Sequence, residues 1–270
     1  VHFFLENGRI SVDGALSAPA DIAVLGTPSN DIQRAFDEQI AALEEEFAKA
    51  GNDMQRDSLR KEYSKLMSDA VEMNRDNIYG VTTFLNNAYA FLSPEEVMEQ
   101  IALFPAEWQQ RTELTDLRKV MEQRLRTTVG QPYVDISAPN ADDEAVSLKS
   151  VIENPANKYV LVDFWASWCG PCLREIPYLQ ADYEKYRKKG FEIYAVSLDD
   201  ERDAWVKTIA DKQMKWIQVC DFKAFDSPAS LDYAVESIPS NFLIDAQGVI
   251  VAKNLRGEDL CSKVAELLAE

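Results

Sequence analysis

Two cysteines of the chain, Cys169 and Cys172, stand in a Cys-Gly-Pro-Cys motif at the point where an apolar strand is expected to end and a helix to begin. The unpaired N–H groups and the dipole of a helix N-terminus stabilise a thiolate, which is the nucleophilic form of cysteine. The two intervening residues place the second sulfur one turn into the helix, close enough to form a disulfide with the first. We therefore expect Cys169 to be an exposed nucleophile and Cys172 to be buried until it closes the disulfide.

The same motif also occurs in zinc sites and in structural disulfides. A zinc site needs two further ligands, and the remaining candidates, Cys220, Cys261 and His2, form no second paired motif. A merely structural disulfide would not require a strand before the motif and a helix after it. A redox-active pair is thus the favoured interpretation, with no metal and no other cofactor expected. Cys220 and Cys261 are expected to be unpaired cysteines, although a second disulfide between them stays open.

Strands and helices alternate around the motif. The segment 159–166 is almost continuously apolar, as expected for a strand buried on both faces of a sheet. Gly130-Gln131-Pro132 interrupts the chain ahead of this alternation and gives the expected start of a domain at 131–270. The other expected elements are strands at 146–148, 191–198, 242–245 and 249–251, and helices at 170–189, 203–212 and 259–268. This order predicts an α/β domain whose mixed central sheet is flanked by helices.

Residues 1–130 are expected to form a separate domain of short strands followed by helices. The expected strands are 1–5 and 9–12, which form a hairpin around an Asn-Gly turn, and 22–25. Three short strands make a small sheet, so we expect earlier strands of this domain to precede residue 1. Apolar residues then recur at helical spacing from about Ser29 to Thr128. Within this stretch Ser93-Pro94-Glu95-Glu96 has the pattern of a capped helix start.

Composition and charge exclude several classes of function. The chain has 270 residues, of which 46% are hydrophobic and 27% charged, and its net charge is −18. A surface this negative repels phosphate backbones and anionic lipid, so we expect no nucleic-acid partner. No run approaches the roughly 18 consecutive apolar residues of a membrane-spanning helix. A single histidine, His2, leaves little material for a Ser/His/Asp triad or a haem site.

The residues around the motif resemble those of a known family. The run from Val162 to Cys172 is similar to the active-site signature of the thioredoxin superfamily, and the continuation Leu173-Arg174-Glu175-Ile176-Pro177 is similar to its TlpA/ResA-like extracytoplasmic branch. Segment 237–245 resembles the part that holds the family's cis-proline. The resemblance covers residues 131–270. Residues 1–130 resemble, more loosely, an uncharacterised N-terminal domain that precedes such modules in Bacteroides-type bacteria.

This resemblance implies roles for individual residues. Cys169 would attack a substrate disulfide and form a mixed disulfide, and Cys172 would then resolve it. Pro239 would be cis and would place the backbone of Ile238 beside the cysteines, where an extended substrate segment could pair with it. Trp168 would form part of an apolar docking surface.

Two carboxylates could accept the proton of Cys172 as it becomes a nucleophile. The resemblance places Asp163 under the second cysteine and Glu175 near the cysteine pair, and burial would raise the pKa of either group. Many relatives have Asn where Asp163 stands, and Ala195 stands roughly where thioredoxins carry a lysine partner for the buried Asp. Glu175 could equally be a solvated residue on the helix face. The division of labour between the two carboxylates therefore stays open.

The function expected from the resemblance is that of a thiol-disulfide oxidoreductase, acting as a reductant in the periplasm or cell envelope. Its partners would be cysteine-containing protein substrates and an electron donor that the sequence does not identify. No leader segment is visible in the chain, and we expect that one has been removed. Two alternatives stay open at this point: a peroxiredoxin-like thiol peroxidase, and a redox-inert binding or scaffold protein.

Overall fold

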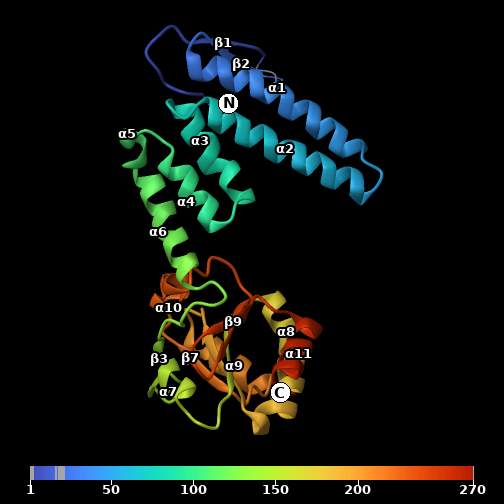
Figure 1. The fold of residues 1–270 in the computed structure, drawn as a ribbon, viewed down its shortest axis with the longest axis vertical. Helices are drawn as coiled ribbons and strands as arrows, with labels where there is room; N and C mark the ends of the chain where they lie inside the picture. The colour runs from blue at the N-terminus through green and yellow to red at the C-terminus, as the bar shows by residue number, and fades with distance from the viewer. Residues whose placement is uncertain (1–2, 16, 18–21, 270) are drawn as a thin grey trace. The chain divides into compact units, whose positions relative to one another are not determined.

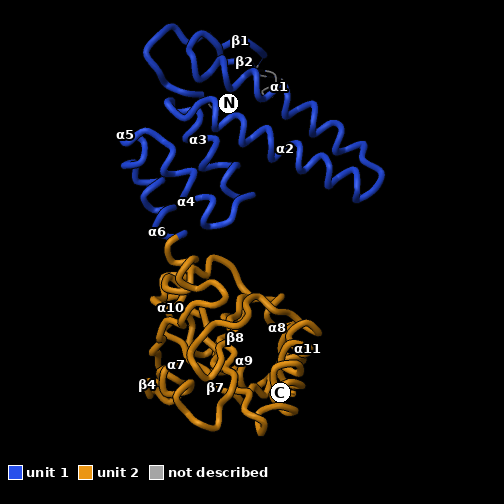
Figure 2. The backbone as a smooth tube through the Cα atoms, in the orientation of Figure 1, with its two compact units in different colours: residues 1–121 blue, residues 122–270 orange. Residues whose placement is uncertain are grey.

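The structure is a computed structural model that describes residues 3–15, 17 and 22–269. Its contacts divide the chain into two compact units, Val1–Met121 and Glu122–Glu270 (Figure 2). The segment 122–130 thus falls in the second unit, whereas the sequence places it with the first. Arg124 pairs with Glu236, and the N–H of Gly130 donates to the carbonyl of Ile250 at 2.8 Å. Val1 and His2 lie outside the described residues.

The first unit is mainly helical, as expected from the spacing of its apolar residues (Figure 1). Its helices are α1 (Pro28–Lys49), α2 (Asp53–Met73), α3 (Ile78–Asn86), α4 (Pro94–Ala102) and α5 (Ala106–Gln109), with a 3-10 turn η2 (Ala88–Phe91). Helix α6 (Thr112–Arg126) begins in the first unit and ends in the second. Helix α4 begins with the expected capping box, in which Ser93 and Glu96 satisfy each other's backbone N–H groups. Met67, Phe84, Ile101 and Leu114 are among the side chains of its fully buried core.

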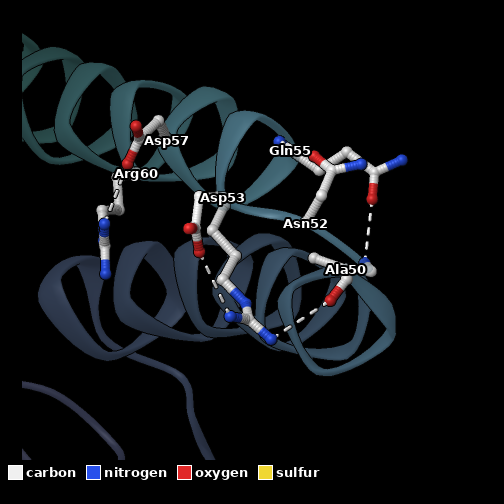
Figure 3. Close-up of polar contacts among 8 residues, drawn as sticks. Ala50, Asn52, Asp53, Gln55, Asp57 and Arg60 are labelled. Atoms are coloured by element: carbon white, nitrogen blue, oxygen red, sulfur yellow. Dashed lines mark hydrogen bonds and ion pairs between the residues drawn. The ribbon is translucent and has the colours of Figure 1, made fainter.

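Polar side chains hold the turn between α1 and α2 (Figure 3). Asn52 caps α2 by accepting from the N–H of Gln55 at 2.9 Å, and Gln55 in return accepts from the N–H of Gly51 at 2.9 Å. Arg56 reaches back to the carbonyl of Ala50 at 3.4 Å. These bonds satisfy backbone groups that the ends of the two helices leave without intrahelical partners.

The predicted hairpin around the Asn-Gly turn is wrong for the residues that the structure describes. Strand β1 (Ser11–Asp13) pairs antiparallel with β2 (Ala23–Leu25), and segment 3–6 forms no strand. The reason lies in Asn30 of α1, whose amide accepts from the N–H of Phe4 at 2.9 Å and donates to the carbonyl of Phe4 at 2.8 Å. A side chain thus supplies the hydrogen bonds that a strand partner would otherwise provide.

The second unit contains the predicted mixed sheet, with strand order β7-β6-β5-β8-β9. These strands are β5 (Tyr159–Trp165), β6 (Phe191–Ser197), β7 (Ile217–Cys220), β8 (Ser240–Asp245) and β9 (Ile250–Lys253). Strands β5, β6 and β7 run parallel, and β8 and β9 are antiparallel to their neighbours. A two-stranded sheet of β3 (Ser137–Pro139) and β4 (Ala145–Ser147) precedes them.

Helices cover both faces of this sheet, and the alternation of side chains along β5 decides which residues face which helices. Leu161 and Trp165 pack in the cluster that contains α8 (Gly170–Tyr186), α9 (Arg202–Asp211) and α11 (Gly257–Leu267). Val160, Val162 and Phe164 pack in the cluster on the side of α7 (Leu148–Ile152) and α10 (Pro228–Asp232). Asp163 therefore lies on the face covered by α8 and α11.

Short 3-10 turns, η3 (Arg187–Lys189) and η4 (Ala224–Asp226), complete the second unit. Across both units, none of the helices within the described residues combines the length and the apolar composition needed to cross a membrane.

Candidate active site

The cysteine pair lies at the start of α8, directly after the loop that follows β5. Cys169 is the N-cap of this helix and forms a disulfide with Cys172, with a Cα–Cα distance of 5.3 Å. The backbone N–H of Cys172 donates to the Sγ of Cys169 at 3.1 Å. One sulfur thus already accepts a hydrogen bond from the helix terminus, the arrangement that lowers the pKa of a cysteine once the disulfide is reduced.

The prediction that Cys169 is exposed is wrong for this oxidised form. Cys169 retains 4% of its accessible surface and Cys172 retains 3%, so the two are equally buried. The disulfide holds both side chains in the apolar cluster formed by α8, α11 and one face of the sheet. The exposed residue of the motif is the neighbouring Trp168, which retains 56% of its surface.

Asp163 is a buried carboxylate on the sheet face beneath α8. It is 6% exposed, and its partners in strand register are Ala195 of β6 and Asn241 of β8. Burial raises the pKa of Asp163 from 3.8 to about 7, with a lowering contribution from the positive charge of Arg256 and a raising contribution from the negative charge of Glu175. A carboxyl group with this pKa can take up or release a proton near neutral pH.

Glu175 projects from α8 about one turn beyond Cys172. It is half-buried, and its Oε2 accepts from the N–H of Gly257 at 2.8 Å, at the first residue of α11. The negative charge of Glu175 raises the pKa of Asp163, so the two carboxylates interact electrostatically. Glu175 is therefore anchored between two helices, which a freely solvated side chain on the helix face would not be.

The segment before β8 supplies the remaining predicted site residues. The Ile238–Pro239 peptide bond is cis, and Ile238 packs against the apolar cluster that contains both cysteines. The ring of Trp168 lies against Phe225 at a centroid distance of 6.4 Å. Trp168, Phe225 and Ile238 are apolar side chains that retain accessible surface, and we call these three residues the apolar rim.

The structure adds three residues that sequence reasoning missed: Arg256, Asn241 and Asp199. Arg256 donates to the carbonyl of Pro239, and Asn241 holds the connection between β9 and α11. Asn241 lies in β8 and Arg256 directly before α11, both far along the sequence from the cysteine motif, so spacing along the sequence gives no signal for them.

Asp199 fixes the loop that carries the cysteine motif. Its carboxylate, which is 1% exposed, accepts from the N–H of Ser167 at 3.0 Å, from the hydroxyl of Ser167 at 2.5 Å and from the hydroxyl of Ser197 at 2.5 Å. Ser167 lies between β5 and Cys169. The end of β6 is thereby tied to the loop from which α8 starts.

Replacing Asp199 by Ala should lower the free energy of unfolding by about 3 kcal/mol, because three buried donors lose a charged acceptor. Urea unfolding followed by tryptophan fluorescence measures this loss. The matched control is Asp200→Ala at the exposed neighbouring position, which should stay within about 0.5 kcal/mol of the parent. Equal effects of the two substitutions would contradict the role given to Asp199.

The other two cysteines are free, as expected. Cys220 is buried at the end of β7, with its Sγ 3.5 Å from the carbonyl of Asp199. Cys261 is half-buried in α11, where burial and a hydrogen bond with Asp182 raise the pKa of its thiol to about 11. High thiol pKa values make both poor nucleophiles, since burial raises the pKa of Cys220 as well. Among the residues that the structure describes, no three His, Cys, Asp or Glu side chains are grouped to hold a metal ion.

The chain is similar in sequence to known proteins. A sequence model of the AhpC/TSA family matches residues 129–253. The thiol-disulfide oxidoreductase ResA of Bacillus thuringiensis subsp. konkukian is 34% identical over 116 residues, which are 41% of this chain and 62% of that protein. The ResA of Bacillus thuringiensis strain Al Hakam is 31% identical over 125 residues, covering 46% of this chain and 67% of that protein. The chain thus spans about three fifths of the first of these relatives.

Similar structures have also been solved. The C-terminal domain of a putative thiol-disulfide oxidoreductase from Bacteroides thetaiotaomicron is 32% identical, with a TM-score of 0.49, and the match covers 53% of this chain and 98% of that one. The thioredoxin domain of a thiol-disulfide oxidoreductase from Bacteroides vulgatus is 35% identical, with a TM-score of 0.48, and the match covers 52% of this chain and 98% of that one.

Proposed function

The chain belongs to the thioredoxin superfamily, in the group of the ResA-like thiol-disulfide oxidoreductases, and we propose that it exchanges disulfides with cysteine-containing proteins through Cys169 and Cys172. The observation that carries the proposal is the bond between these cysteines at the first turn of α8, where the Sγ of Cys169 accepts from the N–H of Cys172. A cysteine at this position is prepared to be both nucleophile and leaving group.

The reaction starts from the reduced pair. The thiolate of Cys169 attacks one sulfur of a substrate disulfide, forms a mixed disulfide and releases the first substrate thiolate. The thiolate of Cys172 then attacks the Sγ of Cys169 and releases the second substrate thiolate, leaving the Cys169–Cys172 disulfide seen in the structure. Two electrons pass to the substrate, and the two released thiolates take up protons. A dithiol electron donor must reduce the pair again before the next turnover.

Asp163 is the group that takes the proton of Cys172 in this proposal. A thiol must lose its proton before it attacks, and a buried carboxyl group with a pKa of about 7 accepts that proton at neutral pH. The negative charge of Glu175 raises the pKa of Asp163, and the hydrogen bond that Glu175 accepts from Gly257 joins α8 to the start of α11. The proposal thus divides the roles of the two carboxylates: Asp163 accepts the proton, and Glu175 raises the pKa of Asp163.

The apolar rim is the proposed docking surface. Trp168 is largely exposed, and Ile238 belongs both to the rim and to the packing around the cysteines. An extended segment of a substrate protein can pair with the backbone at Ile238 while its apolar side chains cover Trp168. The proposed substrates are therefore disulfide-bonded proteins and not small disulfides alone.

We place the protein as a reductant in the cell envelope. The support for this is the resemblance of its Gly-Pro motif to the reducing members of the superfamily, together with the relatives named ResA. The electron donor is proposed only by class, as a dithiol protein.

Reduction of insulin in the presence of a dithiol tests the proposed function. The full chain should accelerate precipitation of the insulin B chain well above the rate given by the dithiol alone. Peroxide consumption coupled to the same dithiol should stay at the uncatalysed rate, because Cys169 stands in a Trp-Cys-Gly-Pro-Cys motif and not as a lone cysteine in the Pro- and Thr-containing loop expected of a peroxidase. Peroxide turnover without insulin reduction would favour a thiol peroxidase, and no turnover in either assay would favour a redox-inert binding protein.

A further inference from the structure

We infer that Arg256 is a positioning residue of this site: its guanidinium group holds the carbonyl of Pro239 and supplies the positive charge that balances Asp163 and Glu175. The inference rests on the proposed function for its catalytic consequence. Its structural part concerns the charge of one buried carboxyl group and can be tested without any substrate.

The hydrogen bonds of Arg256 fix the position of its guanidinium group. One terminal nitrogen donates to the carbonyl of Pro239, and the other donates to the carbonyl of Leu255 at 2.7 Å. Two contacts from one planar group define its orientation, which a lysine ammonium does not achieve. Arg256 is the N-cap of α11, so its hydrogen bond to Pro239 links the start of this helix to the segment that is proposed to bind the substrate.

A second set of bonds explains why residue 256 reaches this place. Asn241 of β8 donates to the carbonyl of Leu255 at 2.8 Å and accepts from the N–H of Leu255 at 3.0 Å. Asn241 is also the register partner of Asp163 in β5. The connection from β9 to α11 is therefore clamped to the strand next to Asp163, and Arg256 follows immediately after the clamp.

The neighbouring elements present few charges to Asp163. Strand β6 contributes the methyl group of Ala195 at the paired position, and β8 contributes the neutral amide of Asn241. Helix α8 contributes Glu175, whose negative charge raises the pKa of Asp163, and the disulfide-bonded cysteines, which carry no charge. Arg256 supplies the opposing positive charge, which lowers that pKa. The next residue, Gly257, donates its N–H to Glu175, so residues 256–257 interact with both carboxylates.

This arrangement accounts for the unexpected Ala195. The sequence leads one to look for a lysine near that position on β6, on one side of Asp163. The structure instead brings a cation on the same face of the sheet but from the β8 flank of β5, at the start of α11. The positive charge is thus linked to the substrate-binding segment, because the same guanidinium group binds Pro239.

Titration of the Asp163 carboxyl carbon by NMR in the oxidised full chain tests the inference directly, with Asp163→Asn identifying the signal. Arg256→Gln removes the positive charge and should raise the titration midpoint by about one pH unit or more. Arg256→Lys keeps the charge and should leave the midpoint close to that of the parent. Lys207→Gln makes the same change of charge at an exposed position of α9 and should leave it unchanged.

The catalytic consequence is read from the pH profile of single-turnover resolution of the mixed disulfide. A higher midpoint in Arg256→Gln should displace the profile upward by the same amount, while Arg256→Lys should restore the profile but weaken substrate binding, since a lysine cannot hold the carbonyls of Pro239 and Leu255 with one planar group. An unchanged NMR midpoint in Arg256→Gln would overturn the inference. A parent protein without insulin turnover would instead overturn the proposed function and leave the NMR result to decide on Arg256.

Discussion

A Cys169→Ser variant should lose at least about a thousandfold in the rate of insulin reduction, because a serine hydroxyl is not ionised at neutral pH and forms no disulfide. The Sγ of Cys169 is the atom at the helix N-terminus, and the other sulfur of the pair, that of Cys172, is buried one turn further along the helix. The rate is measured with the 270-residue chain, a dithiol and insulin, after confirming by circular dichroism that the variant is folded.

The matched control is Cys261→Ser, which removes a thiol from α11 without touching the pair. Because the pKa of Cys261 is raised to about 11, little of it is a thiolate at neutral pH, and the variant should keep the activity of the parent. Activity of Cys169→Ser above about one tenth of the parent would mean that the chemistry lies elsewhere.

The second large effect concerns Asp163→Asn, which should stabilise the oxidised protein by up to roughly 4 kcal/mol at pH 8. The folded-state pKa of Asp163 is about 7 and the reference value is 3.8, and each unit corresponds to about 1.4 kcal/mol. The folded state thus binds more protons between these values, so the contribution of Asp163 to stability is most favourable below about pH 4 and is lost as the pH rises through 7. The gain from Asn should accordingly be larger at pH 8 than at pH 5. Urea unfolding at both pH values measures it, and equal gains would contradict the proposed origin of the effect.

The same substitution should slow exchange while it stabilises the fold. Without Asp163 as proton acceptor, resolution by Cys172 should fall by roughly a hundredfold at neutral pH. Asp182→Asn is the control. Like Asp163, Asp182 is a buried carboxylate whose pKa is raised by burial, but it belongs to α8 and lies about 15 Å along that helix from Cys172. It should stabilise the protein without slowing exchange. A slowing of similar size in both variants would indicate a general effect of stability on the rate.

Long buried elements of the second unit follow well from the sequence. Strand β5 is an apolar run interrupted only by Asp163, and α8 begins at the cysteine motif and ends shortly before Gly190, so both are visible in the pattern of residue types. Their order also predicts the mixed sheet. Short elements such as α7 and α10, with five residues each, span too few turns to show a helical period.

Tertiary contacts decide what the sequence pattern does not. The Asn-Gly signal at residues 7–8 predicts a hairpin, but the side chain of Asn30 takes the backbone groups of Phe4 instead. The site shows the same limit. The cysteines, Asp163 and Glu175 follow from the resemblance of one continuous segment, whereas Arg256 and Asp199 reach the site only through strand order.

Capture of a mixed disulfide by Cys172→Ser tests the central claim most directly. The variant of the 270-residue chain is reduced, mixed with insulin or another disulfide-bonded protein, quenched in acid and analysed by mass spectrometry of its peptides. Disulfide exchange through this pair predicts a stable adduct joined to Cys169, which the parent protein releases because Cys172 resolves it. An adduct at Cys220 or Cys261, or no adduct while the parent still reduces insulin, would contradict it.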